Sequence, residues 1–396
     1  MENKIAYFLS HPVQYFSPLL KELSKGVGLK VYYFSNPDIA GNKDKGFGQT
    51  VQWDIPLLNG YEYVFLKNYS GHQSLDNHFF DVFNPGIIKI LWKEKAKYVI
   101  VNGWTYSSTL FAIFFSRLFG KKIWLRAENP FNQEKQKSRK TLLLKKLFLK
   151  HILFRFFVDK CLYIGTENKL FFDFYGVRDS KLLFTPYAVD NNFFSQQFDQ
   201  LKNNPAQIRE QLGLPADKKI ILFTGKYIDK KRPLDLIMAF QVLNNHNCIL
   251  VMVGEGELRS SMEQFISREK LEGIYLTGFI NQFDISKYYA VADVFVMCSG
   301  MGETWGLSVN EAMNFEKPVI VSKTCGCSTD LVKNGENGFT FPEGDITKLA
   351  HCLAKILGDE EFAIKAGKKS KEIIGNFSID VISENIISAI SSENKE

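Results

Sequence analysis

The sequence is poor in cysteine, and its few cysteines are not arranged for a shared task. The six among 396 residues stand at positions 161, 248, 298, 325, 327 and 352, without the paired spacing of a zinc site or the density of a disulfide scaffold. The only close pair is Cys325-Gly-Cys327, which is better explained as two small residues in a tight loop than as a redox or metal motif. The cysteine content therefore excludes a small disulfide-stabilised protein.

Long apolar runs and a leader segment are also missing. The longest apolar run with helical potential, 109–119, is well short of the ~18 uncharged residues that suggest a membrane span. Residues 1–4 pass directly into a strand-like segment and lack the basic start, apolar stretch and cleavage site of a signal peptide. We therefore expect no membrane-spanning helix, and we expect the protein to remain in the cytoplasm.

The composition is that of a folded α/β protein. Hydrophobic residues make up 45% of the chain and charged residues 23%, and the length suits two domains of roughly 150 to 200 residues each. Strand-like segments alternate with helix-like ones, the pattern of a parallel sheet. Strands are predicted at 4–9, 29–34, 98–101, 122–125, 161–164 and 182–185, and again at 219–224, 248–253, 274–277, 294–297 and 318–321.

This pattern predicts two Rossmann-like, doubly wound parallel sheets in tandem. We place an N-terminal domain at 1–195 and a second domain at 205–375, with a linker in the polar stretch 191–205. A last amphipathic helix, within 376–396, is expected to pack back on the N-terminal domain. Ligands of such sheets bind at the carboxyl ends of the strands, so functional residues are sought in the loops that follow strands.

Cations gather after the strand that ends at Thr224. Gly225-Lys226 and Lys230-Lys231-Arg232 precede Pro233, which suits the first turn of a helix. Lysines beside a helix N-terminus form a suitable site for a diphosphate. The alternative, lysines that merely solubilise a surface turn, is weaker because ligands bind where parallel strands end.

A second candidate site follows the strand at 294–297. A helix is predicted to begin near Gly306, so the amides of 304–307 are unpaired donors directed at a ligand. Glu303 precedes this helix, and Glu311 lies about one and a half turns inside it. A carboxylate accepts two hydroxyl hydrogen bonds, which suits a ribose or sugar diol. Taken alone, two glutamates eight residues apart are more simply read as a solvated helix face.

The ordered motifs of the second domain resemble the retaining glycosyltransferases of family 4, which have the two-domain GT-B fold with a cleft between the domains. One such motif would be weak evidence, whereas the ordered set is specific. The set comprises Gly225-Lys226, Lys231, Val253-Gly254-Glu255-Gly256, Thr277-Gly278-Phe279, Ala292-Asp293-Val294, Ser299, Glu303 with Glu311, Ala312-Met313, Pro318-Val319-Ile320 and Asn334-Gly335 with Gly338.

The resemblance implies a role for each matching position in binding a nucleotide diphosphate sugar. Lys226 and Lys231 are expected to hold the diphosphate, and Glu311 the ribose. Glu303 is expected beside the transferred sugar. Contacts to base, phosphate and sugar are expected from backbone at Gly225, Gly254, Phe279, Thr304, Trp305, Gly306 and Leu307. Lys226 departs from the arginine more usual in the family, and Glu316 stands where a glycine is usual.

The first domain resembles the family less. Its Ser10–Pro18 loop is similar to that of members that build surface polysaccharides, and the acceptor side is expected there. The candidates are His11, Gln14, Trp104, Arg126 and Glu128. For His11, a structural hydrogen-bonding role is equally well supported.

The sequence contains no Asp-x-Asp, and the lysines can take the place of a metal ion at the diphosphate. We therefore predict transfer of a hexose-type sugar, without metal or cofactor, from a UDP- or GDP-sugar to a glycan or lipid-linked acceptor in surface polysaccharide or glycoconjugate synthesis.

A basic segment suggests where such an acceptor is met. Between Lys135 and Arg155 there are eight Lys or Arg residues, interleaved with Leu and Phe, and no acid. A basic amphipathic helix at 136–157 suits the anionic inner face of the cell membrane. The alternative is a core-packing helix with a solvated basic face. No nucleic-acid-binding motif accompanies the segment, so no nucleic-acid partner is expected.

Two other functions remain open from the sequence. A sugar-nucleotide epimerase or hydrolase with the GT-B fold would share the nucleotide site and need no acceptor. A membrane-associated scaffold with a degenerate site would need neither, although both glutamates and both lysines are retained.

Overall fold

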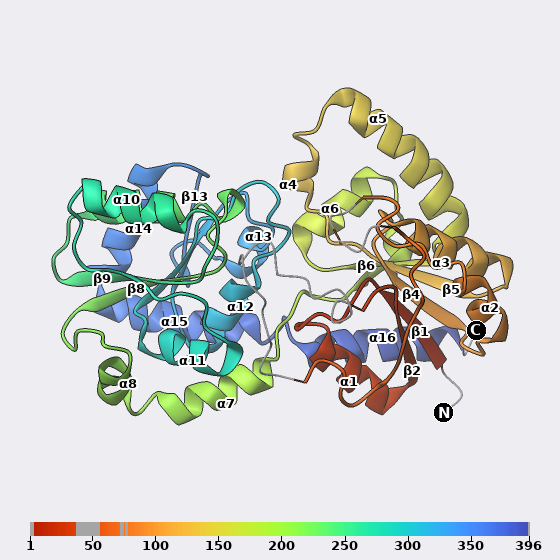
Figure 1. The fold of residues 1–396 in the computed structure, drawn as a ribbon, viewed down its shortest axis with the longest axis horizontal. Helices are drawn as coiled ribbons and strands as arrows, with labels where there is room; N and C mark the ends of the chain where they lie inside the picture. Colours follow the sequence, from red (N-terminus) through yellow and green to blue (C-terminus); the bar gives the residue numbers. More distant parts are fainter. Residues whose placement is uncertain (1–3, 37–55, 72–74, 76–77, 395–396) are drawn as a thin grey trace. The chain divides into compact units, whose positions relative to one another are not determined.

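The structure, a computed structural model, describes residues 4–36, 56–71, 75 and 78–394. Residues 1–3, part of the segment searched for a leader, lie outside this range. The chain forms two compact units (Figure 1). The first contains the described residues up to Pro186 together with those from Ile379 onward, and the second runs from Tyr187 to Ser378.

The first unit is built on a seven-stranded sheet in the order β3-β2-β1-β4-β5-β6-β7, in which every pair is parallel. In register, Ile5 lies opposite Leu29 on one side and Tyr98 on the other. The strands are β1 (Lys4–Leu9), β2 (Gly28–Tyr33), β3 (Glu62–Phe65), β4 (Tyr98–Asn102), β5 (Lys122–Arg126), β6 (Lys160–Tyr163) and β7 (Leu182–Phe184).

Helices cover this sheet because parallel strands are connected by crossovers. They are α1 (Ser17–Gly26), α2 (Ile87–Lys93), α3 (Ser107–Leu118), α4 (Phe131–Glu134), α5 (Arg139–Phe148), the π-helix η2 (Leu149–Phe157), α6 (Thr166–Phe174) and the short η3 (Asp179–Lys181). The C-terminal α16 (Ile379–Glu393) packs on α1 and β7 of the same unit, where Asn385 Nδ2 donates to Phe184 O (2.9 Å).

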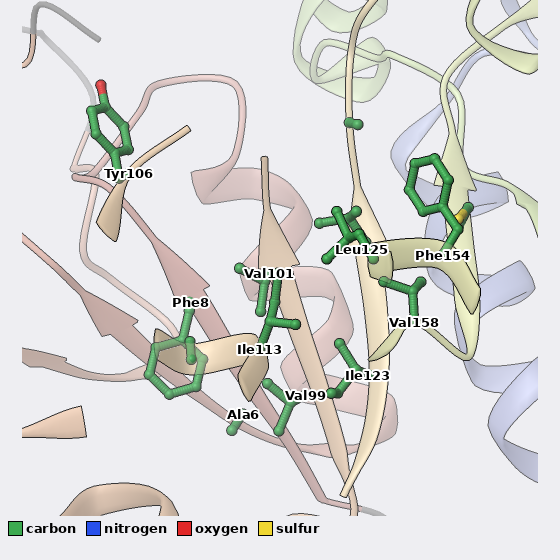
Figure 2. Packing of buried hydrophobic residues seen from close by; sticks show 14 of the residues in the cluster. Ala6, Phe8, Val99, Val101, Tyr106, Ile113, Ile123, Leu125, Phe154 and Val158 are labelled. Carbon is green, nitrogen blue, oxygen red and sulfur yellow. The ribbon is translucent and has the colours of Figure 1, made fainter. Parts of the chain in front are cut away.

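The core of this unit lies between the sheet and its helices. Figure 2 shows Ala6 and Phe8 of β1 beside Val99 and Val101 of β4, with Ile113 of α3 among them. Because both faces of a parallel sheet are covered, nearly every residue of these central strands is buried. Their sequences are therefore almost continuously apolar, which is why the sequence pattern located them.

The second unit has a six-stranded, all-parallel sheet in the order β10-β9-β8-β11-β12-β13. The strands are β8 (Lys219–Thr224), β9 (Cys248–Val253), β10 (Ile274–Leu276), β11 (Val294–Met297), β12 (Val319–Ser322) and β13 (Gly338–Phe341). The helices are α7 (Asn191–Leu201), α8 (Pro205–Gln211), η4 (Asp229–Lys231), α9 (Pro233–Leu243), α10 (Arg259–Arg268), α11 (Gln282–Val291), α12 (Leu307–Asn314), α13 (Ser328–Leu331), α14 (Ile346–Leu357) and α15 (Glu360–Ile374).

The predicted pair of parallel Rossmann-like sheets is confirmed, but one strand of each sheet was missed. Both β3 and β13 are edge strands of four residues. Three of the four residues of β3 are exposed, and two of the four in β13 are half-buried. In β13, Gly338 and Thr340 interrupt the apolar residues that located the central strands. In β3 the apolar stretch Tyr63-Val64-Phe65 is present in the sequence and was overlooked.

Two local assignments also differ from the structure. The stretch 191–205, read as a linker, contains α7, which Asp190 caps by accepting from Phe193 N (2.9 Å) and which buries Phe194. The basic segment 136–157 is not one α-helix. Ser138 caps α5, and the last nine residues are π-helical.

One stretch of the described residues, Glu360–Glu393, is long and apolar enough to cross a membrane by length and composition. It comprises α15 and α16, which are separate helices with a break between Ile374 and Ile379. Buried helices of a folded protein meet the same criterion, and Ile374, Ile382 and Ile386 are buried.

Candidate functional site

The loops after β8 and β9 run against each other with no space for side chains. Gly225 N donates to Val253 O and Tyr227 N to Glu255 O. A Cβ atom on Gly254 would lie 1.9 Å from the carbonyl oxygen of Gly225, and Gly254 also has a φ of 155°. The glycine turn, predicted to let backbone approach a ligand, is thus required first by the approach of two protein loops.

The loop after β8 continues through Lys231 and Arg232. Lys231 ends the short η4, and Arg232 follows in the left-handed conformation with a φ of 50°. The Arg232 guanidinium is held by Asp235 (2.6 Å) and Glu343 (3.4 Å). The Arg232 guanidinium is therefore used in contacts within the protein. The left-handed backbone at Arg232 turns the chain directly after Lys231.

Lys231 meets Glu303, the residue predicted beside the sugar. The Nζ of Lys231 lies 2.5 Å from Oε2 of Glu303, and Glu303 is only 7% exposed. Burial raises the pKa of Glu303, but Lys231, Lys230 and a hydrogen bond from Ser299 outweigh it, so the net pKa is lowered. Glu303 is accordingly an ionised carboxylate in a nearly closed environment.

The amides that follow Glu303 are placed as the sequence predicts. Gly306, with a φ of 105°, precedes α12, and within the described residues no acceptor is found for the amides of 304–308. The loop after β12 hydrogen-bonds to the carbonyl groups of this segment: Gly326 N donates to Glu303 O, and Cys327 N donates to Trp305 O. A Cβ on Gly326 would lie 1.8 Å from Thr304 O, so these two loops are also in direct backbone contact.

The cysteine pair belongs to the loop after β12. Cys325 and Cys327 are free, fully buried and 3.7 Å apart at sulfur. Cys325 Sγ donates to Trp305 O (2.7 Å), and burial raises the pKa of the Cys327 thiol well above its usual value. Both therefore fill a tight loop as small buried residues, as the simpler interpretation of the sequence held.

The side chain of Trp305 is turned into the protein. It is 2% exposed, its Nε1 donates to Asn310 Oδ1 (2.8 Å), and its rings pack near Tyr187 and Phe377. Only the backbone of Trp305 is available to a ligand, in agreement with the expected amide contact.

Glu311 is the second member of the glutamate pair, and the structure supplies partners that the sequence did not reveal. Tyr289 Oη donates to Oε2 of Glu311 (2.6 Å) and lies 2.8 Å from Oγ1 of Thr224 at the end of β8. Within the described residues the other carboxylate oxygen has no hydrogen-bond partner. Burial raises the pKa of Glu311 to about 7, although Tyr289 and Lys231 act in the opposite direction.

The remaining donor-side positions lie on neighbouring loops. Lys226 follows Gly225 in the loop after β8 and is half-buried. Phe279, also half-buried, follows Gly278, which is bridged to Gly254. The predicted donor residues thus lie in the loops after β8, β9, β10 and β11 and at the start of α12, all at the carboxyl edge of one sheet.

The acceptor-side candidates of the first unit are largely engaged in internal contacts. Arg126 is 3% exposed, donates to Thr185 and lies over the ring of Phe16. Trp104 stacks on Phe171 with 5.8 Å between ring centroids. Both residues are therefore bound into the structure of this unit.

The other three candidates lie near strand ends. Glu128 pairs with Arg126 (3.7 Å). His11 is half-buried with Nδ1 2.9 Å from Ser10 Oγ, and burial lowers its pKa. Gln14 lies in the same loop, half-buried. These polar groups remain candidates for acceptor contacts.

Comparison with known families now bears on the second unit. Residues 205–373 match the family described as glycosyl transferases group 1. The matched segment contains the loops after β8, β9, β10 and β11, the start of α12 and both glutamates.

Relatives and solved structures extend this comparison. The chain is 30% identical over 187 residues to an uncharacterized glycosyltransferase of Methanocaldococcus jannaschii, covering 45% of this chain and 46% of the relative. It is 24% identical over 238 residues to the capsular polysaccharide biosynthesis glycosyltransferase CapM of Staphylococcus aureus, covering 59% and 58%. The chain thus spans about half the length of these curated relatives.

The structure of Anabaena HepE in complex with UDP and glucose superimposes with a TM-score of 0.73 at 17% identity, covering 98% of this chain and 100% of that one. The fold is GT-B. At this identity the likeness establishes the fold alone.

Proposed function

We propose that the protein is a retaining glycosyltransferase that moves a hexose-type sugar from a UDP- or GDP-sugar to a glycan or lipid-linked acceptor. The observation that carries this proposal is the buried Lys231–Glu303 pair beside the unpaired amides of 304–308. A cation and helix amides beside one carboxylate suit a sugar diphosphate, whose leaving group gains negative charge while the sugar becomes electron-poor.

In the proposed reaction, the bond between the anomeric carbon and the diphosphate oxygen breaks. The acceptor hydroxyl oxygen forms the new bond on the same face, and its proton passes to the departing diphosphate. Lys226, Lys231 and the amides of 304–307 stabilise the departing charge. Glu303, ionised beside Lys231, lies at the sugar, and Glu311 accepts from the ribose hydroxyls. Gly225, Gly254 and the backbone at Phe279 shape the nucleotide site.

A direct measurement tests the activity. Thermal shifts with UDP, GDP, ADP and CMP identify the nucleotide, because a ligand that binds the folded state raises the melting temperature. The matching sugar nucleotide is then incubated with candidate acceptors, and NMR of the first product formed reads the anomeric configuration. An inverted linkage contradicts the retaining mechanism, and rapid epimerisation or release of sugar without acceptor identifies an epimerase or hydrolase instead.

Two substitutions separate the proposed roles of the glutamates. Glu303→Gln keeps the size of the side chain and removes its charge, so turnover is expected to fall more than donor affinity. Glu311→Ala removes the ribose contact, so donor affinity is expected to fall. Equal effects of the two changes on binding alone would contradict both roles.

We propose that the transfer needs neither metal nor cofactor, because Lys226, Lys230 and Lys231 supply positive charge at the diphosphate. Activity that is abolished by a chelator and restored by a divalent ion would overturn this.

We also propose that the protein acts at the inner face of the cell membrane through the basic segment 136–157. No residue of α5 is buried, and Leu143, Leu144 and Leu147 are more than half exposed. The structure changes which cations are available, since Lys137 and Lys145 both pair with the buried Glu134. Lys135, Arg139, Lys140, Lys146 and Arg155 remain exposed for an anionic surface.

A further inference from the structure

Helix α3 of the first unit leaves large apolar side chains exposed on its outer face. Its buried side chains are mostly small or polar, whereas Phe114 and Leu118 are 49% and 64% exposed. The inward hydroxyls find acceptors: Ser107 Oγ donates to Val82 O, and Ser108 Oγ to Asn84 Oδ1. A helix on the surface of a folded unit normally turns its large apolar residues inward, so the outer face of α3 is built for a second contact.

This outer face continues onto the neighbouring helices through aromatic rings. From α2, Trp92 contacts Phe119 at 5.4 Å between centroids, and Phe119 is followed by Phe115 at 6.2 Å. Phe114, 5.2 Å from Phe115, then reaches Phe157 of η2 at 6.1 Å. Trp92 is 74% exposed. We call this band, with the exposed Leu118, Ile152 and Phe156, the aromatic strip.

The charges around the aromatic strip have one sign. The sequences of α2, α3, α5 and η2 contain nine Lys or Arg residues and no Asp or Glu. Lys89 and Lys93 flank Trp92 and are exposed. The acids that lie close are already paired, since Glu94 accepts from Tyr32 and Asp159 from Arg117.

We propose that the aromatic strip is a second membrane-contacting surface, by which α2 and α3 lie on an anionic phospholipid bilayer with Trp92 at the headgroup level. This inference rests on the membrane association proposed above and extends it from one helix to a surface of three neighbouring elements. Tryptophan is favoured where apolar chains meet headgroups, and lysines beside it can extend their ammonium groups toward lipid phosphates.

A bilayer fits this surface better than a second copy of the chain. In a twofold dimer the same patch faces itself, so Lys89 and Lys93 would be set against like charges. Anionic lipid supplies the opposite charge over the whole surface, and fluid headgroups need no matching groove.

The test uses the tryptophan itself. Trp124 and Trp305 are buried, Trp104 is half-buried and stacked on Phe171, and Trp53 lies outside the described residues. The emission change specific to Trp92 is therefore taken as the difference between the intact protein and Trp92→Phe. With vesicles of phosphatidylcholine and phosphatidylglycerol, the emission of Trp92 is expected to shift to the blue and to be quenched by brominated lipid. With phosphatidylcholine alone, a much smaller change is expected.

Flotation with the same vesicles measures the energetic role. Trp92→Ala with Leu118→Ala is expected to weaken binding about tenfold or more, because two exposed apolar anchors are lost. The matched control, Val242→Ala with Ile364→Ala, removes two side chains of the second unit that are each 55% exposed and is expected to leave binding unchanged. Donor thermal shifts of both double variants verify that they are folded.

The outcomes separate this inference from the proposal for 136–157. If Leu143→Ser with Leu147→Ser abolishes flotation and the Trp92 variant floats normally, the aromatic strip is refuted and the membrane role of the basic segment stands. If the intact protein does not float, both are refuted. A blue shift that appears with rising protein concentration without lipid would identify the strip as a contact between copies and overturn the inference.

Discussion

The two units differ in what they leave exposed and in how closely their loops are packed. Of the twenty large hydrophobic side chains exposed among the described residues, only Val242, Phe283, Met301 and Ile364 belong to the second unit. Conversely, the glycines whose added Cβ would come within 2.6 Å of a backbone atom all lie in the second unit. They are Gly254, Gly256, Gly326, Gly338 and Gly367.

This difference bears on why the glycine motifs were found in the second unit. Loops held in backbone contact have room for glycine alone at each close approach, so their sequences carry glycines at fixed places. In the first unit, Gly71, Gly86, Gly103 and Gly120 have no neighbouring atom within 4 Å of an added Cβ. Space alone therefore does not require glycine at these four positions.

The largest expected effect tests the charged site of the second unit. Lys231→Ala removes the cation that both faces the diphosphate and pairs with Glu303, so kcat/KM is expected to fall roughly 100- to 1,000-fold, the usual cost of one transition-state donor. Steady-state kinetics with the identified donor measure it. Lys348→Ala, at an exposed lysine of α14, is the matched control, and a similar loss in both variants would contradict a specific role.

A second prediction tests the packing of the loops. Gly254→Ala would place a Cβ 1.9 Å from Gly225 O at a φ of 155°, so the free energy of unfolding should fall by about 3 kcal/mol or more. Gly86→Ala, in the first unit, has open space and should change stability by less than about 0.5 kcal/mol. Urea unfolding compares the two. Equal stability losses would remove the contrast between the units.

A third prediction concerns the partner of Glu311. Tyr289→Phe removes the hydrogen bond that orients the Glu311 carboxyl group, so the donor Kd should rise about five- to tenfold, the size expected for one ordinary hydrogen bond, with kcat nearly unchanged. In the Glu311→Ala background the same change should have little further effect, since the group that it orients is absent. Independent, additive losses in calorimetry would show that Tyr289 acts through packing alone.

A last prediction follows from the pKa of Glu311. Its folded pKa of about 7 lies above the usual value of 4.5, so the folded state binds the proton more tightly. Stability from this group is complete below pH about 4.5 and is lost as pH rises through about 7, by roughly 3 kcal/mol, since one pKa unit corresponds to about 1.4 kcal/mol. Glu311→Gln should remove that slope from unfolding curves measured between these pH values. A slope unchanged by this substitution would contradict the shifted pKa.

Much of the second unit follows from local sequence. The apolar runs of β8, β9 and β11 are buried throughout, and the residues that follow them were located correctly at the strand ends. The edge strand β13 was missed because Gly338 and Thr340 interrupt its apolar residues, whereas the apolar stretch of β3 was present in the sequence and was overlooked. Residues 191–201 were read as a linker because their many polar residues conceal the buried Phe194 and the Asp190 cap.

The candidate site shows the same division. Lys231, Glu303 and the amides of 304–307 could be named because the ordered motifs around them resemble a known family; their spacing alone would not have sufficed. Tyr289 could not, since it stands 22 residues before Glu311 in a different helix. Arg126 was predicted as an acceptor-side residue but donates to Thr185. Thr185 directly follows β7, two strands away from β5 in the sheet, so the contact depends on the assembled sheet.

The sequence by itself determined the two parallel sheets and the strand-end loops in which the candidate site residues lie, because burial period and strand-end position are local properties. Only the tertiary structure decided which charges pair and which apolar residues stay outside. Lys145 of the basic segment pairs with Glu134. In α3 the three serines are buried, whereas Phe114 and Leu118 are exposed. Which charges pair and which apolar side chains stay exposed depend on elements that are distant in the chain, so no local pattern specifies them.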